Sequence, residues 1–172
     1  GLEPDKYDKS RTSPMAGVVW RATKQLSVYG NYIEGLAQGA TAPAVAVNRG
    51  TVLAPYVSKQ KEVGVKADLG RIGGGLAFFS TEKPSGLLDA NNVFSAGGRD
   101  RHNGVELNVY GAATRSLRVL GGLTFLDAKQ VHTEGGLNDG KRVIGVPRVQ
   151  ANLGAEWDVP GVSGLALDGR VV

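Results

Sequence analysis

Apolar and polar residues alternate along most of this chain with a period of two. The alternation is clearest over residues 149–157, where every second position is apolar: Val149, Ala151, Leu153, Ala155 and Trp157. Successive side chains of a β-strand point to opposite faces of the sheet, so this pattern predicts a strand with one apolar face and one polar face. Residues 62–69 and 104–110 show the same pattern.

Less regular runs rich in β-branched, aromatic and other apolar residues predict further strands at residues 14–21, 26–34, 72–81, 117–127 and 165–172. The chain is therefore expected to be all-β, with about eight strands. No stretch of similar length has the periodicity of a helix.

The connections between the predicted strands alternate in length. Short turns are expected at residues 22–25, 70–71, 113–116 and 160–164, and long polar loops near 35–58, 82–101 and 128–147. Outer-membrane β-barrels have short periplasmic turns at one rim and longer loops at the extracellular rim, whereas soluble β-sandwiches usually keep their connections short. The order of lengths favours an antiparallel transmembrane β-barrel.

Composition and charge narrow the classes of protein. The 20 Lys and Arg residues are scattered among 16 acidic residues, so no basic stripe indicates nucleic acid as a partner. There is no cysteine, which excludes disulfides, thiolate metal sites and thiol nucleophiles. No apolar run is long enough for a membrane-spanning helix, but membrane-spanning strands need only about 10 residues of alternating character.

A barrel and a sandwich place the two faces of these strands differently. In a barrel the apolar face meets lipid and the polar face lines the lumen, which suits Glu62, Asp68, Glu106, Asn108, Asn152 and Glu156. Aromatic residues near strand ends are candidates for the interfacial girdle: Trp20, Tyr32, Phe78, Phe79, Phe125 and Trp157. The alternative is a soluble or surface β-sandwich that binds a partner through its long loops.

Five segments resemble TonB-dependent siderophore receptors. Two lie where a loop meets a strand: Ser58–Lys66 (SKQKEVGVK) resembles the family's S-x-Q-x-E-x-G-x-K segment, and Gly98–Leu107 (GRDRHNGVEL) its G-x-x-R-x-x-G-x-E-x segment. Residues 13–18, 26–35 and 140–147 agree as well, in the order that the family has them. Each segment is weak alone, but five in order form a specific signal.

The resemblance implies the C-terminal part of a larger barrel that is plugged by a separate N-terminal domain. Residues 1–172 would be an incomplete portion of about eight strands, without the plug and without the first and last strands of the barrel, because the chain stops at Val172 in mid-strand. The intact receptor would lie in the bacterial outer membrane. It would take up ferric siderophores with energy from TonB, which engages the missing N-terminal part, and it would catalyse no reaction and need no cofactor.

Loops held by a rigid wall are where such a receptor recognises its ligand, and Arg, Lys and aromatic side chains suit bulky anionic chelates. The candidates are Arg49, Tyr56, Lys59, Arg99, Arg101, His102, His132, Lys141 and Arg142. The same residues could be solvated loop charges or contact lipopolysaccharide phosphates. Glu62 and Glu106 occupy matching positions in two strands, and we expect them to form structural contacts across the wall or to the plug.

Neither metal binding nor catalysis is indicated. His102 and His132 are the only histidines and lack neighbouring ligands at metal spacing, so no protein metal site is expected. Asp89, Asn91 and Asn92 lack the rest of a calcium loop and predict an ordinary turn. No nucleophile turn that would mark a hydrolase is present.

Overall fold

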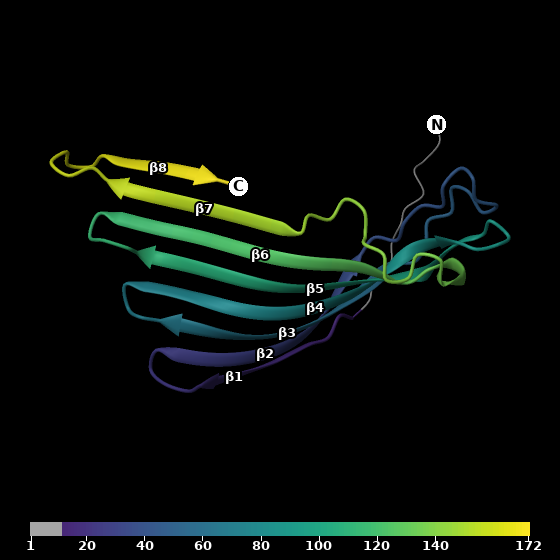
Figure 1. Cartoon of the computed structure of the whole chain (residues 1–172), viewed down its shortest axis with the longest axis horizontal. Helices are drawn as coiled ribbons and strands as arrows, with labels where there is room; N and C mark the ends of the chain where they lie inside the picture. Colours follow the sequence, from purple (N-terminus) through teal and green to yellow (C-terminus); the bar gives the residue numbers. More distant parts are fainter. Residues whose placement is uncertain (1–11) are drawn as a thin grey trace.

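The computed structural model describes residues 12–172, so residues 1–11 of the expected barrel portion lie outside the described residues. It contains one antiparallel sheet in which every strand pairs with its neighbours in the sequence (Figure 1). The strands are β1 (Met15–Arg21), β2 (Leu26–Ala37), β3 (Tyr56–Asp68), β4 (Ile72–Leu88), β5 (Phe94–Ala112), β6 (Leu117–His132), β7 (Val149–Asp158) and β8 (Ala166–Val171).

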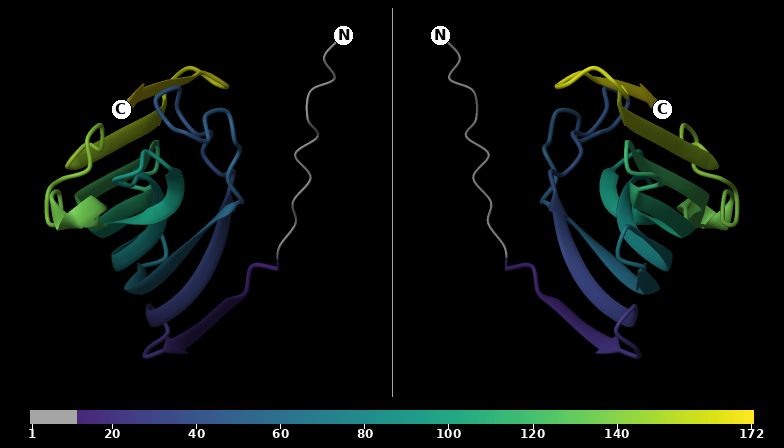
Figure 2. Two further views of the ribbon diagram at one scale, coloured as in Figure 1. Left: turned by 90° about the vertical axis from the view of Figure 1, so that its right-hand side faces the viewer. Right: turned by 90° about the vertical axis from the view of Figure 1, so that its left-hand side faces the viewer.

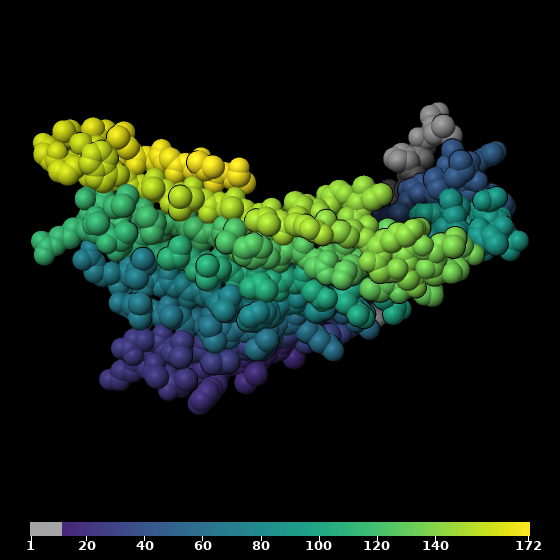
Figure 3. Space-filling model, in the orientation of Figure 1, coloured from purple at the N-terminus to yellow at the C-terminus, as the bar shows by residue number. Residues whose placement is uncertain are grey.

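The sheet is curved like a gutter, and the end-on views of Figure 2 show its arc. The tight turns that join β1 to β2, β3 to β4, β5 to β6 and β7 to β8 gather at one end of the sheet, and the other three connections, two of them long loops, gather at the opposite end (Figure 1). Figure 3 shows the same two ends in the space-filling view. In the described chain, seven strand residues are almost fully buried, and six of them share the face that carries Glu62: Gly64, Gly73, Ala77, Gly98, Asp100 and Ala128. The seventh, Gly121, lies on the other face. Side chains crowd on the inside of a curve, so this polar face is the concave one.

The eight expected strands are confirmed, but the long loop expected at residues 82–101 is wrong. Strands β4 and β5 continue through it to Leu88 and Phe94, and they leave only a short turn between them. The polar character of this stretch indicated a loop, yet the two strands pair here with an irregularity between Ser85 and Leu87. Backbone pairing needs no apolar alternation where both faces of a strand meet water.

The sandwich alternative is also wrong, because a sandwich needs a second sheet against the apolar face. Within residues 12–172 all eight strands belong to one sheet. The apolar side chains on its convex face are about half exposed, for example Val63 at 53% and Phe125 at 50%. No helix in this part of the chain is long and apolar enough to cross a bilayer.

The convex face carries an apolar band of the height that a membrane requires. On each central strand, four or five successive outward positions are apolar or glycine. On β3 these are Val63, Val65, Ala67 and Leu69, and the next outward residue toward the loops, Lys61, is the first polar one. Outward positions are two residues apart and gain about 5 Å of height on a strand tilted by ~40°. The band is therefore about 20–25 Å tall, close to the ~25 Å of outer-membrane barrels.

Five of the six aromatic residues expected in the girdle lie on the convex face, and Phe79 does not. Phe78 pairs with Val63 and Val105 in the apolar band, so the next residue, Phe79, points to the concave face. There the Phe79 ring lies over Gly104 and occupies the space that a Cβ on Gly104 would need. The expectation for Phe79 is wrong because only one of two successive aromatic residues can face the lipid.

Glycines on the concave face let large side chains lie flat against the wall. The Tyr29 ring crosses the neighbouring strand over Gly64, where an added Cβ would come within 2.7 Å of it. The same arrangement holds for Phe79 over Gly104 and for Tyr110 over Gly73. The concave face is therefore lined by side chains that lie along the wall instead of filling the space it encloses.

Candidate functional site

A hydrogen-bonded network centred on Glu62 covers the middle of the concave face. The Tyr29 hydroxyl donates to Glu62 Oε1 at 2.7 Å, and Asn31 Nδ2 donates to the same oxygen at 3.5 Å. Gln60 Nε2 donates to Glu62 Oε2 at 3.2 Å, and Thr81 Oγ1 donates to Gln60 Oε1 at 2.9 Å. The network joins β2, β3 and β4, so the carboxylate of Glu62 is held as an acceptor between strands.

Three polar atoms on the concave face are buried and have no hydrogen-bond partner among residues 12–172: Asn31 Oδ1, Tyr56 Oη and His102 Nε2. His102 of β5 pairs directly with Thr81 of β4. Burial, and then the charge of Lys83, lower the pKa of His102, so its imidazole is neutral at pH 7. Buried polar groups are normally satisfied by protein or ordered water, so these three atoms have hydrogen-bonding capacity left for another group.

The convex face becomes charged just above the apolar band. The first polar outward residues, in strand order, are Tyr32, Lys61, Ser80, Asn103 and Asp127. Two residues further toward the loops is a row that we call the outer charged belt: Glu34, Lys59, Glu82, Arg101 and Lys129.

Within the outer charged belt, Arg101 is bound to a partner on the next strand. Its guanidinium forms an ion pair with Glu82, and its Nε donates to Glu82 Oε1 at 3.0 Å. The hydrogen bond from Arg101 holds the pKa of the Glu82 carboxyl below its ordinary value. Arg101 is thus engaged on the outside of the wall and not on the side of the lumen.

The loop between β2 and β3 is tied to the start of β5 through the side chain of Asn48. Asn48, in the loop between β2 and β3, donates from Nδ2 to the carbonyl of Phe94 and accepts from its amide, both at 2.9 Å. The predicted turn at Asp89 is present, because Asp89 Oδ1 accepts from the amides of Asn91 and Val93. After β6, a short 3₁₀ helix, η1 (Glu134–Gly136), begins the last long loop.

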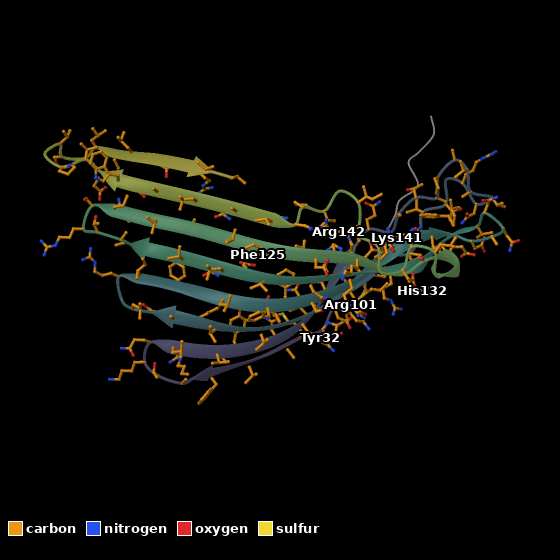
Figure 4. The ribbon with its side chains drawn as sticks, in the orientation of Figure 1. Tyr32, Arg101, Phe125, His132, Lys141 and Arg142 are labelled. Carbon is orange, nitrogen blue, oxygen red and sulfur yellow. The ribbon has the colours of Figure 1, made fainter. Side chains whose placement is uncertain are left out.

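The structure places the predicted ligand-binding residues in three regions: the concave face, the loop end and the convex face. Tyr56 and His102 lie on the concave face, and His132, Lys141 and Arg142 lie at the loop end (Figure 4), as does Arg49 in the loop after β2. Lys59, Arg99 and Arg101 lie on strands and alternate with inward residues, which places them on the convex face. Glu106 lies on the concave face opposite Ala77 and is exposed.

Sequence reasoning missed Asp100, the one buried charged residue of the described chain, which is 7% exposed. The sequence signal that could have pointed to Asp100 is its position between Arg99 and Arg101, but this charged segment was expected to be a loop. No group of three or more His, Asp or Glu residues within 12–172 is placed to hold a metal ion.

A single curved meander with an apolar convex face, a polar concave face, short turns at one end and loops at the other is part of the wall of a transmembrane β-barrel. The chain belongs to the TonB-dependent receptor β-barrel family, because it matches the family described as "TonB dependent receptor-like, beta-barrel" over residues 3–171. This confirms the resemblance drawn from the five segments, and it places the chain in a family of outer-membrane receptors and transporters, which are not enzymes.

Several relatives are similar over almost the whole chain. The ferrichrome receptor FcuA of Yersinia enterocolitica is 37% identical over 96% of this chain, and the ferrichrome outer membrane transporter/phage receptor of Escherichia coli K12 is 30% identical over 95%. The crystal structure of BauA, the ferric preacinetobactin receptor of Acinetobacter baumannii, superposes with a TM-score of 0.74 and 42% identity over 94% of the chain. The match spans 23%, 22% and 25% of these proteins, so this chain corresponds to about a quarter of their length.

Proposed function

We propose that this chain is the C-terminal barrel portion of a TonB-dependent outer-membrane receptor that imports ferric siderophores. The observation that carries the proposal is the 42% identity to a ferric preacinetobactin receptor over 94% of the chain, together with the similarity to two ferrichrome receptors. The barrel wall is the scaffold in this function, and the loops and the concave face are the surfaces that a chelate meets on its way inward.

The experiment that tests this proposal is uptake of radioactive iron by cells with and without the intact receptor. A panel of ferric siderophores is supplied singly to the parent strain, to a receptor deletion and to a tonB deletion. We expect uptake of at least one siderophore to disappear in both deletions and to return when the receptor is restored. Uptake that is unchanged across the whole panel in the receptor deletion would refute the proposal.

We also propose that the concave face contacts the plug domain. The support is the set of unpartnered buried atoms on Asn31, Tyr56 and His102, beside the network that Glu62 organises. Replacing Glu62 with Ala in the full receptor removes the acceptor for three side chains and should loosen plug seating, which raises sensitivity to large antibiotics that cannot normally pass the barrel. Asp127→Ala, on the convex face, is the matched control. Antibiotic sensitivity and iron uptake that stay normal in Glu62→Ala would count against this role.

For ligand recognition we propose the residues that face the lumen or the loops: Arg49, Tyr56, His102, His132, Lys141 and Arg142. Lys59, Arg99 and Arg101 point outward, so we assign them to contacts with the outer-membrane lipid, where their charges match lipopolysaccharide phosphates just above the apolar band. Lys59→Gln combined with Lys61→Gln should lower the amount of lipopolysaccharide that copurifies with the receptor. The inward-facing Lys66→Gln should not, and equal loss in both would contradict the assignment.

A further inference from the structure

A pocket lies on the concave face at the loop end, where three strands and one loop meet. Its polar lining includes Ser85 of β4, Asp100 of β5, Gln130 and His132 at the end of β6, and Glu134 of η1. Leu87, Leu88 and Leu137 form its apolar wall. Gln130 is directly opposite Asp100, and Ser85 is directly opposite Gly98, two residues from Asp100. Because Arg101 points outward, Asp100 points inward, toward the space that a ligand enters.

The carboxylate of Asp100 is buried with little to balance its charge. The residue is 7% exposed, and its Oδ1 accepts one hydrogen bond, from Ser85 Oγ at 3.2 Å. Lys83 lies directly across on β4 but is exposed, and Asp100 forms no ion pair within residues 12–172. Burying an ionised carboxylate costs several kcal/mol unless a cation or several donors compensate it.

The charge of the pocket lining has one sign. Asp100 and Glu134 are both acidic, and neither Lys nor Arg lines the pocket. The described chain has no cluster of His, Asp and Glu that could hold a metal ion, so a bare metal is not the expected occupant. An organic cation fits better, because its charged end can meet Asp100 while its carbon chain packs against Leu137.

The rim of the pocket is held in place by the loop that follows β6. Thr133 Oγ1 accepts from the Asn138 amide at 3.0 Å and donates to Asp139 Oδ1 at 2.8 Å. The backbone of Gln130 donates to the carbonyl of Lys141 at 2.9 Å and accepts from the amide of Gly140 at 2.8 Å. The pocket is thus formed before a ligand arrives, which lowers the cost of binding.

We propose that this pocket is a recognition subsite for a protonated amine, or a comparable organic cation, carried by the imported chelate. The inference rests on the proposed uptake of ferric siderophores and names a chemical feature of the substrate. It assigns to Asp100 a direct ion pair with that cation. It also differs from the expectation that basic side chains alone would recognise an anionic ligand.

The test measures binding of paired ferric chelates to the purified full receptor. Each pair consists of an iron chelate with a free primary amine and the same chelate with that amine acetylated, in both the hydroxamate and the catecholate class. Asp100→Asn keeps the shape of the side chain and the acceptor for Ser85 but removes the charge. Asp127→Asn, which neutralises a carboxylate on the convex face of the next strand, is the matched control.

We expect the wild-type receptor and Asp127→Asn to bind at least one amine-bearing chelate about tenfold more tightly than its acetylated partner, which is the effect of ~1.4 kcal/mol. In Asp100→Asn this preference should vanish while binding of the acetylated chelate is unchanged. Equal binding of both forms to the wild type, or an equal loss of both in Asp100→Asn, would overturn the subsite and leave the proposed uptake intact. A receptor that binds no ferric chelate of any class would refute the proposed function, and the subsite with it.

Discussion

Leu107→Arg tests whether the convex face of this sheet meets lipid. Leu107 lies near the middle of the apolar band on β5, between Val105 and Val109, and its outward side chain is 51% exposed. An Arg on the lipid face near the bilayer midplane of an outer-membrane barrel costs about 2–4 kcal/mol. The expected result is a loss of that size in the free energy of unfolding of the full receptor in phospholipid vesicles.

The matched control places the same side chain one residue away, at Glu106→Arg. Glu106 is exposed on the concave face, where an Arg can remain in water, so this change should cost less than ~1 kcal/mol. Both variants are compared with the wild type by guanidinium titration, followed by tryptophan fluorescence. Equal costs for the two variants, or a larger cost at Glu106, would mean that the assignment of lipid and lumen faces is reversed or that the convex face is covered by protein.

Three further predictions follow from particular contacts. Gly64→Ala places a Cβ 2.7 Å from the Tyr29 ring and should lower the free energy of unfolding by about 1–3 kcal/mol. In a Tyr29→Ser background this cost should largely disappear, and an unchanged cost would refute the contact. Because Arg101 lowers the folded-state pKa of Glu82, their ion pair stabilises the fold above the unfolded pKa of ~4.3, and this stabilisation is lost as pH falls through the folded value. The deficit of Glu82→Gln in unfolding free energy, about 0.2–1 kcal/mol at pH 7, should therefore shrink as pH falls below ~4.3, and a deficit that stays constant or grows would contradict this. Each end strand has one open edge within residues 12–172, so the polypeptide 1–172 alone should self-associate in buffer, and a monodisperse monomer in sedimentation velocity would contradict this.

The strands could be predicted from the sequence wherever the two faces of the sheet meet different surroundings. Val149 to Trp157 alternate because lipid lies on one side and water on the other, and the structure places a strand there. Above the band both faces of β4 and β5 meet water, so the alternation ends although the backbone pairing continues to Leu88 and Phe94. The loop expected at residues 82–101 was therefore an error that hydrophobic pattern alone could not avoid.

The candidate site was harder to predict than the fold because it is built from segments that are distant in the sequence. Ser85, Asp100 and Gln130 meet only once the register of three strands is known. Arg101 was predicted to bind ligand because of its residue type. The face of the sheet that it occupies follows from alternation along β5, and the loop expected at residues 82–101 hid the fact that this strand continues to Arg101 and beyond. The family resemblance, in contrast, needed only short motifs in the correct order and was confirmed.

The order β1 to β8 follows the order of the chain, so each strand finds its partner in the segment just made or just about to follow. Such a wall can grow by one hairpin at a time, since no strand has to wait for a distant part of the polypeptide before its backbone is paired on one side. Each tight turn lets its two strands cross the bilayer together. Pairing of the strands in this region therefore needs no step that brings remote segments of the polypeptide together.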